Sequence, residues 1–465
     1  MNITSSADVV VVGSGISGLT CAFLLQRSGK TVLVLEQADR FGGAIRSERR
    51  DGWLIEAGPN STLETTPLLT ELIRDAGVEN KKLYADNAAN NRYILRAGVL
   101  LPLPMSPPKF IATKLFSWKA KLRLFREPFI APSSPDAQES VGEFVRRRLG
   151  KEFLDYAINP FVAGVYAGDP ALLSVRASFP KLFELEQKYG SLIKGQLQGA
   201  RERKRSTEKS KQSARMFSFT DGMQTLTDAI AERLPLKVMG ATVISLTRSG
   251  TSPNDRSYTV RFVTEGQTHT VTASTIIIAT PAQPAADLTR SITPGIDDAL
   301  QSVPYPPVAE VLTGFRRQPG MHALDGFGFL IPKVEQRRIL GTIFSSTIFS
   351  DRAPEGHVLL TTFIGGMRQP EEAERDHAGI LETALSEQHA LLGTPMEPVF
   401  SHVTSWKHAI PQYVDGHLDR MRIIDDAEAA NPGLLFCANY RGGISVGDCV
   451  KSAHAVVEKI LTRMV

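Results

Sequence analysis

The sequence is poor in cysteine and has no long apolar run. Its three cysteines, Cys21, Cys437 and Cys449, show neither metal-site nor disulfide spacing, which favours a reducing compartment. No run of 18 or more apolar residues is present, so no membrane-spanning helix is predicted. The first strand signal starts near residue 8, which leaves no room for a cleavable signal or transit peptide. We therefore expect a cytoplasmic location.

An internal repeat is also absent, and the composition is that of a folded, soluble protein. Hydrophobic residues make up 42% of the 465 residues, and the mean hydropathy is -0.10. A chain of this length is too long for one simple core, so two or three domains are expected.

Acidic residues are missing from one segment. Residues 92–126 hold eight lysines or arginines and no acid, among large apolar residues such as Phe110, Trp118 and Phe125. Such a segment can lie on an anionic bilayer surface or form an ordinary amphipathic helix packed on the core, and the pattern leaves both open. Residues 200–215 are basic without large apolar residues, which predicts a solvated or disordered loop. Nucleic-acid binding is not expected, because no aromatic residues interleave with these charges.

The most informative segment is a glycine-rich turn between a strand and a helix. Four valines, Val9 to Val12, predict a buried parallel strand, and a helix follows from about residue 17 to 28. The three glycines of such a turn allow a tight bend, close approach to a pyrophosphate and close packing of helix on strand. The helix would point its free N–H groups at the phosphates. The turn consists of Gly13, Ser14, Gly15, Ile16, Ser17 and Gly18.

An acid after the second strand and a second glycine pair narrow the prediction to FAD. Glu36 ends the strand TVLVLE, where its carboxylate can accept hydrogen bonds from ribose hydroxyls and would repel a 2′-phosphate. Residues 40–46, RFGGAIR, resemble a segment of the large flavoprotein group that holds amine oxidases, phytoene desaturases and protoporphyrinogen oxidases. Glycine turns of an empty α/β fold are the alternative, which the full strand–helix–strand context disfavours. The expected FAD contacts in this segment are Glu36, Gln37, Arg40, Gly42, Gly43, Ala44 and Arg46.

Later segments indicate further pieces of the same site. Residues 136–195 have apolar residues at helical spacing, whereas residues 305–365 alternate between strands and loops, as in an antiparallel sheet. The short strand GATVISL places Val243 where an apolar contact to adenine is expected. HTVTAS and TIIIATP read as successive strands, and the second ends near Thr280, where ligands of parallel sheets gather. The tail brings another helix N-terminus, near Gly447, within reach of the cofactor.

Blocks spread along nearly the whole chain resemble one family in a single register. The chain resembles the protoporphyrinogen IX oxidase family of FAD enzymes. The blocks are WLIEAGPNS (53–61), NNRYILRAG (90–98), NPFVAGVYAGDPALLSVRASFP (159–180), FGFLIP (327–332), LGTIFSS (340–346), SDRAPEGHVLLTTFIGG (350–366), SWKHAIPQY (405–413) and ANYRGGISVGD (438–448).

The resemblance implies an α/β plus α+β fold with three interleaved parts. A Rossmann-type FAD-binding domain is expected at 1–90, 206–285 and 405–465. An antiparallel-sheet substrate domain is expected at 286–404, and a helical membrane-binding domain at 91–205.

Several site residues carry over where the motifs match. Arg92 corresponds to an arginine that pairs with a substrate propionate, and a guanidinium binds a carboxylate in a bidentate fork. Leu330, Ile343 and Phe363 correspond to residues that sandwich the tetrapyrrole, where apolar and aromatic faces suit a flat macrocycle. Read alone, Arg92 would be a surface residue and the other three would be core residues. The resemblance also implies substrate contact at Ala163 and Gly164, and cofactor contact at Gly58, Pro59, Asn60, Trp406, Ile444 and Val446.

Two positions depart from the family pattern. Ile343 stands where relatives often have leucine, and Ala167 stands where several have glycine. The fit of substrates or inhibitors can therefore differ, while the assignment itself is not affected.

The resemblance implies oxygen-dependent oxidation of protoporphyrinogen IX to protoporphyrin IX, with six electrons passing to the flavin in three two-electron steps. Dioxygen would reoxidise the flavin and give hydrogen peroxide. None of the histidines lies in a segment that demands a catalytic acid or base, so none is assigned. The resemblance further implies a homodimer that is peripherally attached to a membrane surface.

Three alternatives remain at this point. Oxidation of coproporphyrinogen III to coproporphyrin III is a sister activity on the same scaffold, and its four-propionate substrate would require a more basic pocket. An amine oxidase or carotenoid desaturase would not explain the blocks at 159–180 and 327–366 together. A non-catalytic binder related to GDP-dissociation inhibitors needs no intact flavin site, whereas the glycine turn, Glu36 and the RFGG loop are all present here.

Overall fold

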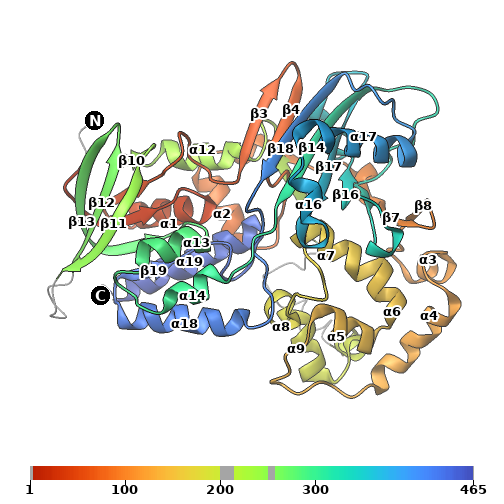
Figure 1. Ribbon diagram of the computed structural model, residues 1–465, viewed down its shortest axis with the longest axis horizontal. Helices are drawn as coiled ribbons and strands as arrows, with labels where there is room; N and C mark the ends of the chain where they lie inside the picture. Colours follow the sequence, from red (N-terminus) through yellow and green to blue (C-terminus); the bar gives the residue numbers. More distant parts are fainter. Residues whose placement is uncertain (1–3, 199–213, 250–256, 464–465) are drawn as a thin grey trace.

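Two seven-stranded sheets and a separate group of helices make up the protein (Figure 1). The structure is a computed structural model, and it describes residues 4–198, 214–249 and 257–463. In Figure 1 the first sheet lies at the left, the second at the upper right and the helical group at the lower right. The basic loop predicted at 200–215 falls almost entirely outside the described residues.

The first sheet contains the strand that precedes the glycine turn. β1 is parallel to β2 on one side and to β13 on the other, so that Val9 lies opposite Val32 and Thr275. The strand order is β10 (Leu236–Val238), β2 (Val32–Leu35), β1 (Ser6–Val12), β13 (Gln267–Ile278), β12 (Ser257–Thr264) and β11 (Thr242–Ser249), with β19 (Leu434–Phe436) also paired to β13.

β13 joins the parallel and antiparallel halves of this sheet. Its beginning pairs antiparallel with β12, and its last three residues pair in parallel with β19 as well as with β1. The segments HTVTAS and TIIIATP, which the sequence suggested as two strands, are therefore one continuous strand.

Both faces of the first sheet are covered by helices, as the run of valines predicts. Val9 and Val11 enter one apolar cluster and Val10 and Val12 enter another, because successive side chains of a strand point to opposite faces. The first cluster is completed by α1 (Ile16–Arg27), α2 (Pro67–Asp75), α12 (Gln224–Glu232) and α19 (Val446–Arg463). The second is completed by α13 (Ala282–Thr289), α14 (Ile296–Gln301) and α18 (His417–Ala430).

The second sheet is antiparallel except for one pair, and it takes strands from two distant parts of the chain. β7 and β8 belong to it, since β7 pairs in parallel with β15 and antiparallel with β8. The expected start of the helical domain at residue 91 is therefore too early, because residues 92–102 form sheet. The strand order is β18 (Phe400–Trp406), β14 (Val308–Arg316), β17 (His357–Gly365), β16 (Gly341–Ile343), β15 (Gly328–Leu330), β7 (Arg92–Arg96) and β8 (Val99–Pro102).

Helices pack on one face of this second sheet, whereas Trp53 and Ile55 pack on Leu312 and Leu359 of the other face. Val311, Leu360 and Ile364 share a core with Ile380 and Ala384 of α17 (His377–Leu392). Three shorter pieces accompany the sheet: α15 (Ser345–Ile348), a turn at Ser350–Arg352 and α16 (Pro370–Ala373).

The helical group follows β8 and, in the described residues, runs from 107 to 198. Ser140 begins α5 with a capping box, in which its hydroxyl accepts from the Glu143 N–H and the Glu143 carboxylate accepts from the Ser140 N–H. No helix in the described ranges is long and apolar enough to cross a membrane. The group consists of α3 (Pro107–Ala112), α4 (Trp118–Arg123), a 3₁₀ turn (Leu124–Phe129), α5 (Val141–Arg148), α6 (Lys151–Phe153), a π-helical turn (Leu154–Ile158), α7 (Asn159–Tyr166), α8 (Val175–Ser178), α9 (Pro180–Tyr189) and α10 (Leu192–Gln198).

Two small sheets lie between the larger units. One is the hairpin of β3 (Arg46–Arg50) and β4 (Trp53–Ala57), which leads from the RFGG loop to Gly58. The other has the order β5 (Thr62–Leu63), β9 (Met216–Phe219) and β6 (Lys82–Tyr84). Together they connect residues expected at the flavin with residues expected at the substrate.

Candidate flavin and substrate site

The glycine turn has the shape that a bound pyrophosphate requires. Gly13 has φ of +100°, and a Cβ there would lie 2.9 Å from the Ala279 carbonyl oxygen. A Cβ at Gly18 would lie 2.1 Å from the Gly13 carbonyl oxygen, whereas a Cβ at Gly15 would meet nothing within 4 Å. Gly15 caps α1 without a side-chain hydrogen bond, so the first N–H groups of the helix stay available to an anion.

The RFGG loop packs directly on this turn. The Gly42 N–H donates to the Ser14 carbonyl oxygen at 3.0 Å, and a Cβ at Gly43 would lie 2.8 Å from the Gly15 Cα. Arg40 donates to the carbonyl oxygens of Phe41 and Ile45, at 3.1 and 3.0 Å, and so closes its own loop. A phosphate contact of Arg40 stays a prediction.

Glu36 is held beside the turn by hydrogen bonds. One carboxylate oxygen accepts from the Ser14 N–H at 2.8 Å and from the Ser14 hydroxyl at 2.6 Å. The other accepts from the Ala38 N–H at 2.9 Å. The Ala241 N–H donates to the Glu36 carbonyl oxygen at 2.8 Å, which brings the start of β11, and with it Val243, to the same edge of the sheet.

Two buried polar atoms, one at this edge and one at the end of β18, lack a hydrogen-bond partner of good geometry among the described residues. They are the Thr280 hydroxyl and the Trp406 indole N–H. Thr280 follows β13 next to the glycine turn, since the Thr280 N lies 3.2 Å from where a Gly13 Cβ would be. Buried polar atoms normally find partners, so the Thr280 hydroxyl, with the open space at Gly15, suits a polar cofactor, whereas the Trp406 N–H lies near Glu310.

A second contact region extends the cofactor path toward the second sheet. A Cβ at Gly58 would lie 2.1 Å from the Ala44 carbonyl oxygen and 4.0 Å from the Trp406 ring. The Gly58 N–H donates to both carboxyl oxygens of Glu310, at 3.1 and 3.2 Å. Ala44, Gly58 and Trp406 are therefore neighbours, as expected for residues along one cofactor.

Two buried glutamates lie in this region, and sequence reasoning missed both. Burial raises the pKa of Glu56 to about 7, although Ser47, Arg352 and the Met223 N–H favour its charged form. Burial likewise raises the pKa of Glu310 to about 8, against the effect of the Gly58 N–H. The signal was present, because each is the one acid within an otherwise apolar strand segment, WLIEA and VAEVL.

Cross-strand pairing brings the expected substrate residues onto one face of the second sheet. Leu330, Gly341, Phe363, Glu310 and Thr404 lie directly opposite one another across β15, β16, β17, β14 and β18. Directly opposite residues of antiparallel strands share a face. The neighbouring row contains Arg92, Gly328, Ile343, Thr361, Leu312 and His402.

Ile343 connects these rows to the flavin-side segment. Ile343 and Asn60 line the same small cavity of about 10 Å³, which Thr361, Glu56 and Arg352 also line. Ile343, a predicted substrate contact, and Asn60, a predicted flavin contact, therefore lie at the same cavity.

Arg92 lies at the edge of its row without an acidic partner. No carboxylate of the described residues lies within ion-pair distance of it, and its guanidinium carbon lies 5.5 Å from the centre of the Phe327 ring. Burial of the side chain lowers its pKa. Arg92 is nonetheless an exposed residue at the start of β7, and a guanidinium without a counter-ion suits a substrate carboxylate.

α7 closes the site from the helical side. Ala163 is buried and packs with Phe363, while Gly164 is exposed. A Cβ at Gly164 would lie 2.6 Å from the Leu330 Cδ2, so any larger residue there would require the Leu330 side chain to shift. Ala167 has φ of +49°, a left-handed conformation in which the glycine of its relatives would be unstrained.

The remaining predicted cofactor contacts lie outside the two groups of residues described above. Ile444 packs against the same helical cluster as Leu330, and Val446 begins α19 as a buried residue. Gln37 is exposed, Arg46 lies 3.8 Å from Glu48, and Pro59 links Gly58 to Asn60. The structure does not test their roles as cofactor contacts.

Comparison with known proteins identifies the family. Residues 16–461 match the family described as flavin containing amine oxidoreductase. The chain belongs to this family. Membership confirms the prediction of an FAD-dependent oxidoreductase and agrees with the mixed α/β fold.

Relatives within the family span the full chain. The mitochondrial protoporphyrinogen oxidase of Nicotiana tabacum is 34% identical over 99% of this chain and 95% of its own. The coproporphyrinogen III oxidase of Bacillus subtilis (strain 168) is 29% identical over 98% of both. Among solved structures, a provisionally named protoporphyrinogen oxidase from Exiguobacterium sp. 255-15 superimposes with a TM-score of 0.80 at 24% identity, covering 99% of each chain.

Proposed function

We propose that this chain oxidises protoporphyrinogen IX to protoporphyrin IX with FAD, in porphyrin biosynthesis. The observation that carries this is one sheet face that joins Arg92, Ile343, Leu330 and Phe363 to the segment at Gly58. The full-length relatives named protoporphyrinogen oxidase support the same substrate. FAD, when bound, supplies the electron-accepting chemistry.

The chain itself would bind, orient and enclose the macrocycle. Arg92 would hold a propionate, while Leu330, Ile343 and Phe363 would pack on the ring faces. Gly164 of α7 lies close against Leu330, so α7 would border the macrocycle on the helical side of the site. Dioxygen as electron acceptor and assembly as a homodimer are parts of the proposal; oxygen consumption and light scattering test them.

Coproporphyrinogen III is the second candidate substrate, because the Bacillus relative carries that name at full coverage. Its additional propionates would need additional cationic partners. In the two rows described above, the basic side chains of the described residues are Arg92 and His402, which favours the substrate with fewer propionates. Both porphyrinogens should be assayed side by side by porphyrin fluorescence. We expect faster turnover of protoporphyrinogen IX, and equal or faster turnover of coproporphyrinogen III would overturn the assignment.

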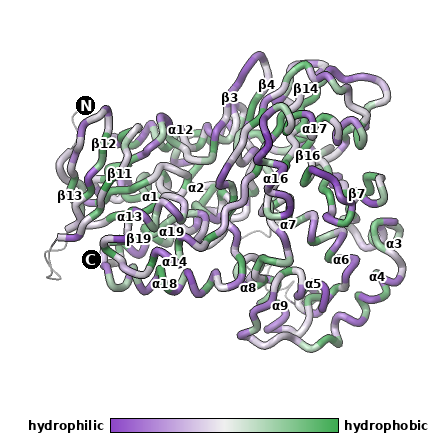
Figure 2. Tube along the Cα trace, viewed as in Figure 1, coloured by the Kyte–Doolittle hydropathy of each residue, from purple (hydrophilic) through white to green (hydrophobic). Residues whose placement is uncertain are grey.

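We further propose that α4 and the following turn dock on an anionic membrane surface. Trp118, Leu122, Phe125 and Phe129 are 64%, 62%, 75% and 87% exposed, with the exposed cations Lys119 and Arg126 beside them. Figure 2 shows hydrophobic and hydrophilic residues following closely on each other along α3 and α4. Leu115 and Phe116, which precede α4, are instead buried in the helical core, so the docking proposal does not include them.

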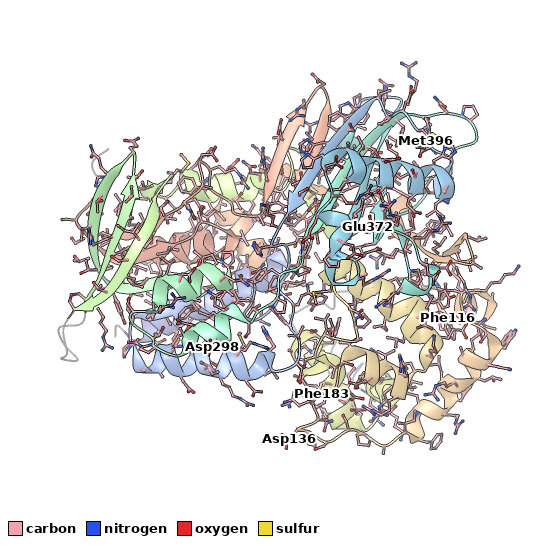
Figure 3. All side chains as sticks on the ribbon, in the orientation of Figure 1. Phe116, Asp136, Phe183, Asp298, Glu372 and Met396 are labelled. Atoms are coloured by element: carbon pink, nitrogen blue, oxygen red, sulfur yellow. The ribbon has the colours of Figure 1, made fainter. Side chains whose placement is uncertain are left out.

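The docking proposal predicts that Phe125→Ser/Phe129→Ser lowers binding to vesicles of anionic lipid by about tenfold or more. The measurement is co-sedimentation with phosphatidylserine vesicles at low and high salt, where salt should also release the wild type. Met396→Ser/Val399→Ser is the matched control, since these residues are 44% and 61% exposed and Met396 lies apart from the helical group that holds Phe116 (Figure 3). Equal binding by all three proteins would contradict the proposal.

A further inference from the structure

β14 carries one carboxyl group among buried neighbours. All residues from Val308 to Phe315 are buried, and Glu310 is 5% exposed. Its two oxygens share the Gly58 N–H as a donor. The Trp406 indole N–H lies near enough to favour the charged form, but it makes no hydrogen bond of good geometry within the described residues. A buried carboxylate with so few donors is costly unless it takes up a proton.

Glu310 stands where the two halves of the proposed site meet. It lies opposite Phe363 on β17 and Thr404 on β18, in the row that also contains Leu330. Its side chain also contacts the backbone of Gly58, which leads through Pro59 to Asn60. No other side chain of that row links the sheet to the flavin-side segment by a hydrogen bond in the described part of the chain.

We propose that Glu310 is a positioning residue that, as a neutral carboxylic acid, holds the Gly58–Asn60 segment at the flavin without placing a negative charge there. The inference rests on the proposed function, which supplies the flavin and the substrate on either side. A carboxyl group accepts a hydrogen bond from the Gly58 N–H in either protonation state. Only its neutral form adds no negative charge where the Gly58–Asn60 segment meets the substrate face.

The charges around Glu310 favour its neutral form. The nearby charged group is Glu56 on β4, a like charge that disfavours ionisation, and Arg352 is directed to Glu56 at 3.8 Å. β17 and β18 present Phe363 and Thr404, which carry no charge. No basic side chain lies within ion-pair distance of Glu310 among the described residues.

The first test measures stability and needs neither cofactor nor substrate. The pKa of Glu310 is raised from its ordinary 4.5 to about 8, so the folded protein binds the additional proton between these values. The proton bound to Glu310 stabilises the folded protein fully below about pH 4.5. This stabilisation is lost as the pH rises through about 8. The urea midpoint of wild-type apoprotein should therefore fall between about pH 6 and about pH 9, and that of Glu310→Gln should fall less.

The second test measures turnover against pH. Glu310→Gln keeps an uncharged acceptor for the Gly58 N–H, so it should keep kcat/KM within about threefold at pH 7 and should lose the alkaline decline of the wild type near pH 8. Glu310→Ala removes the acceptor and should lose about tenfold or more in FAD retention. Glu387→Gln is the matched control, a buried glutamate on α17 outside the substrate face, and should keep the wild-type pH profile.

Two outcomes would overturn the inference. A loss of about 100-fold or more in kcat/KM for Glu310→Gln at pH 7 would mean that an ionised carboxylate is required. Unaltered pH dependence of both the urea midpoint and kcat/KM would mean that Glu310 holds no titrating proton. If the wild type turns over neither porphyrinogen, the proposed function fails, and the urea series still decides whether Glu310 is neutral.

Discussion

Alanine in place of Gly15 is expected to weaken FAD binding by about 100-fold while leaving the apoprotein as stable as the wild type. Each hydrogen bond from a backbone N–H to a charged phosphate contributes about 1.5–3 kcal/mol, and a methyl group in the pyrophosphate position would prevent at least one of them. The apoprotein should tolerate the change, because Gly15 has an ordinary φ of −61° and its Cβ would meet no other atom within 4 Å.

Gly18→Ala provides the matched comparison. Its Cβ would lie 2.1 Å from the Gly13 carbonyl oxygen, so α1 must move away from β1. We expect this variant to lose FAD binding and also about 2 kcal/mol or more of apoprotein stability. FAD titration of the deflavinated proteins and urea unfolding separate the two effects, and wild-type FAD affinity of Gly15→Ala would show that the turn does not hold the pyrophosphate.

Arg92→Ala is expected to raise the KM for protoporphyrinogen IX by about 10–100-fold with a much smaller change in kcat. A charge-assisted hydrogen bond contributes about 1.5–3 kcal/mol, and a propionate far from the reacting carbon is bound equally in the ground and transition states. Folding should be preserved, because Arg92 has no ion pair among the described residues and contacts the Phe327 ring.

Steady-state kinetics with Arg92→Lys and Arg316→Ala complete this test. Lysine keeps the charge but not the bidentate fork, so an intermediate KM is expected. Arg316 is an exposed arginine at the end of β14 on the same sheet, and its removal should leave KM unchanged. The propionate role of Arg92 is wrong if its alanine variant has the KM of the wild type.

The glycine turn could be predicted from the sequence because its constraints are local. The expected helix from about residue 17 to 28 corresponds to α1 at Ile16–Arg27. The need for positive φ at Gly13 and for close packing at Gly18 arises within a few residues of chain. A motif of this kind carries its own geometry, so residue spacing was sufficient.

Long-range pairing could not be predicted in the same way. The resemblance implied a helical domain from residue 91, and nothing within the segment of β7 shows that its partner is β15, which begins at Gly328. Glu310 was visible as a lone acid in an apolar strand, but its hydrogen-bond donor Gly58 is 252 residues away. The substrate face was predicted residue by residue through resemblance, and only the register of the sheet shows that those residues share it.

The pairing of β1 with β13 has a consequence for the order in which the protein can fold. Asp8 and Ser274 are joined by a hydrogen bond across 266 residues. At a synthesis rate of about 5–20 residues per second, β1 must wait roughly 13–50 s on the ribosome before β13 exists. During that time β1 can pair with β2, but its other edge has no partner strand, which makes the nascent chain dependent on protection from aggregation until the middle of the molecule has been made.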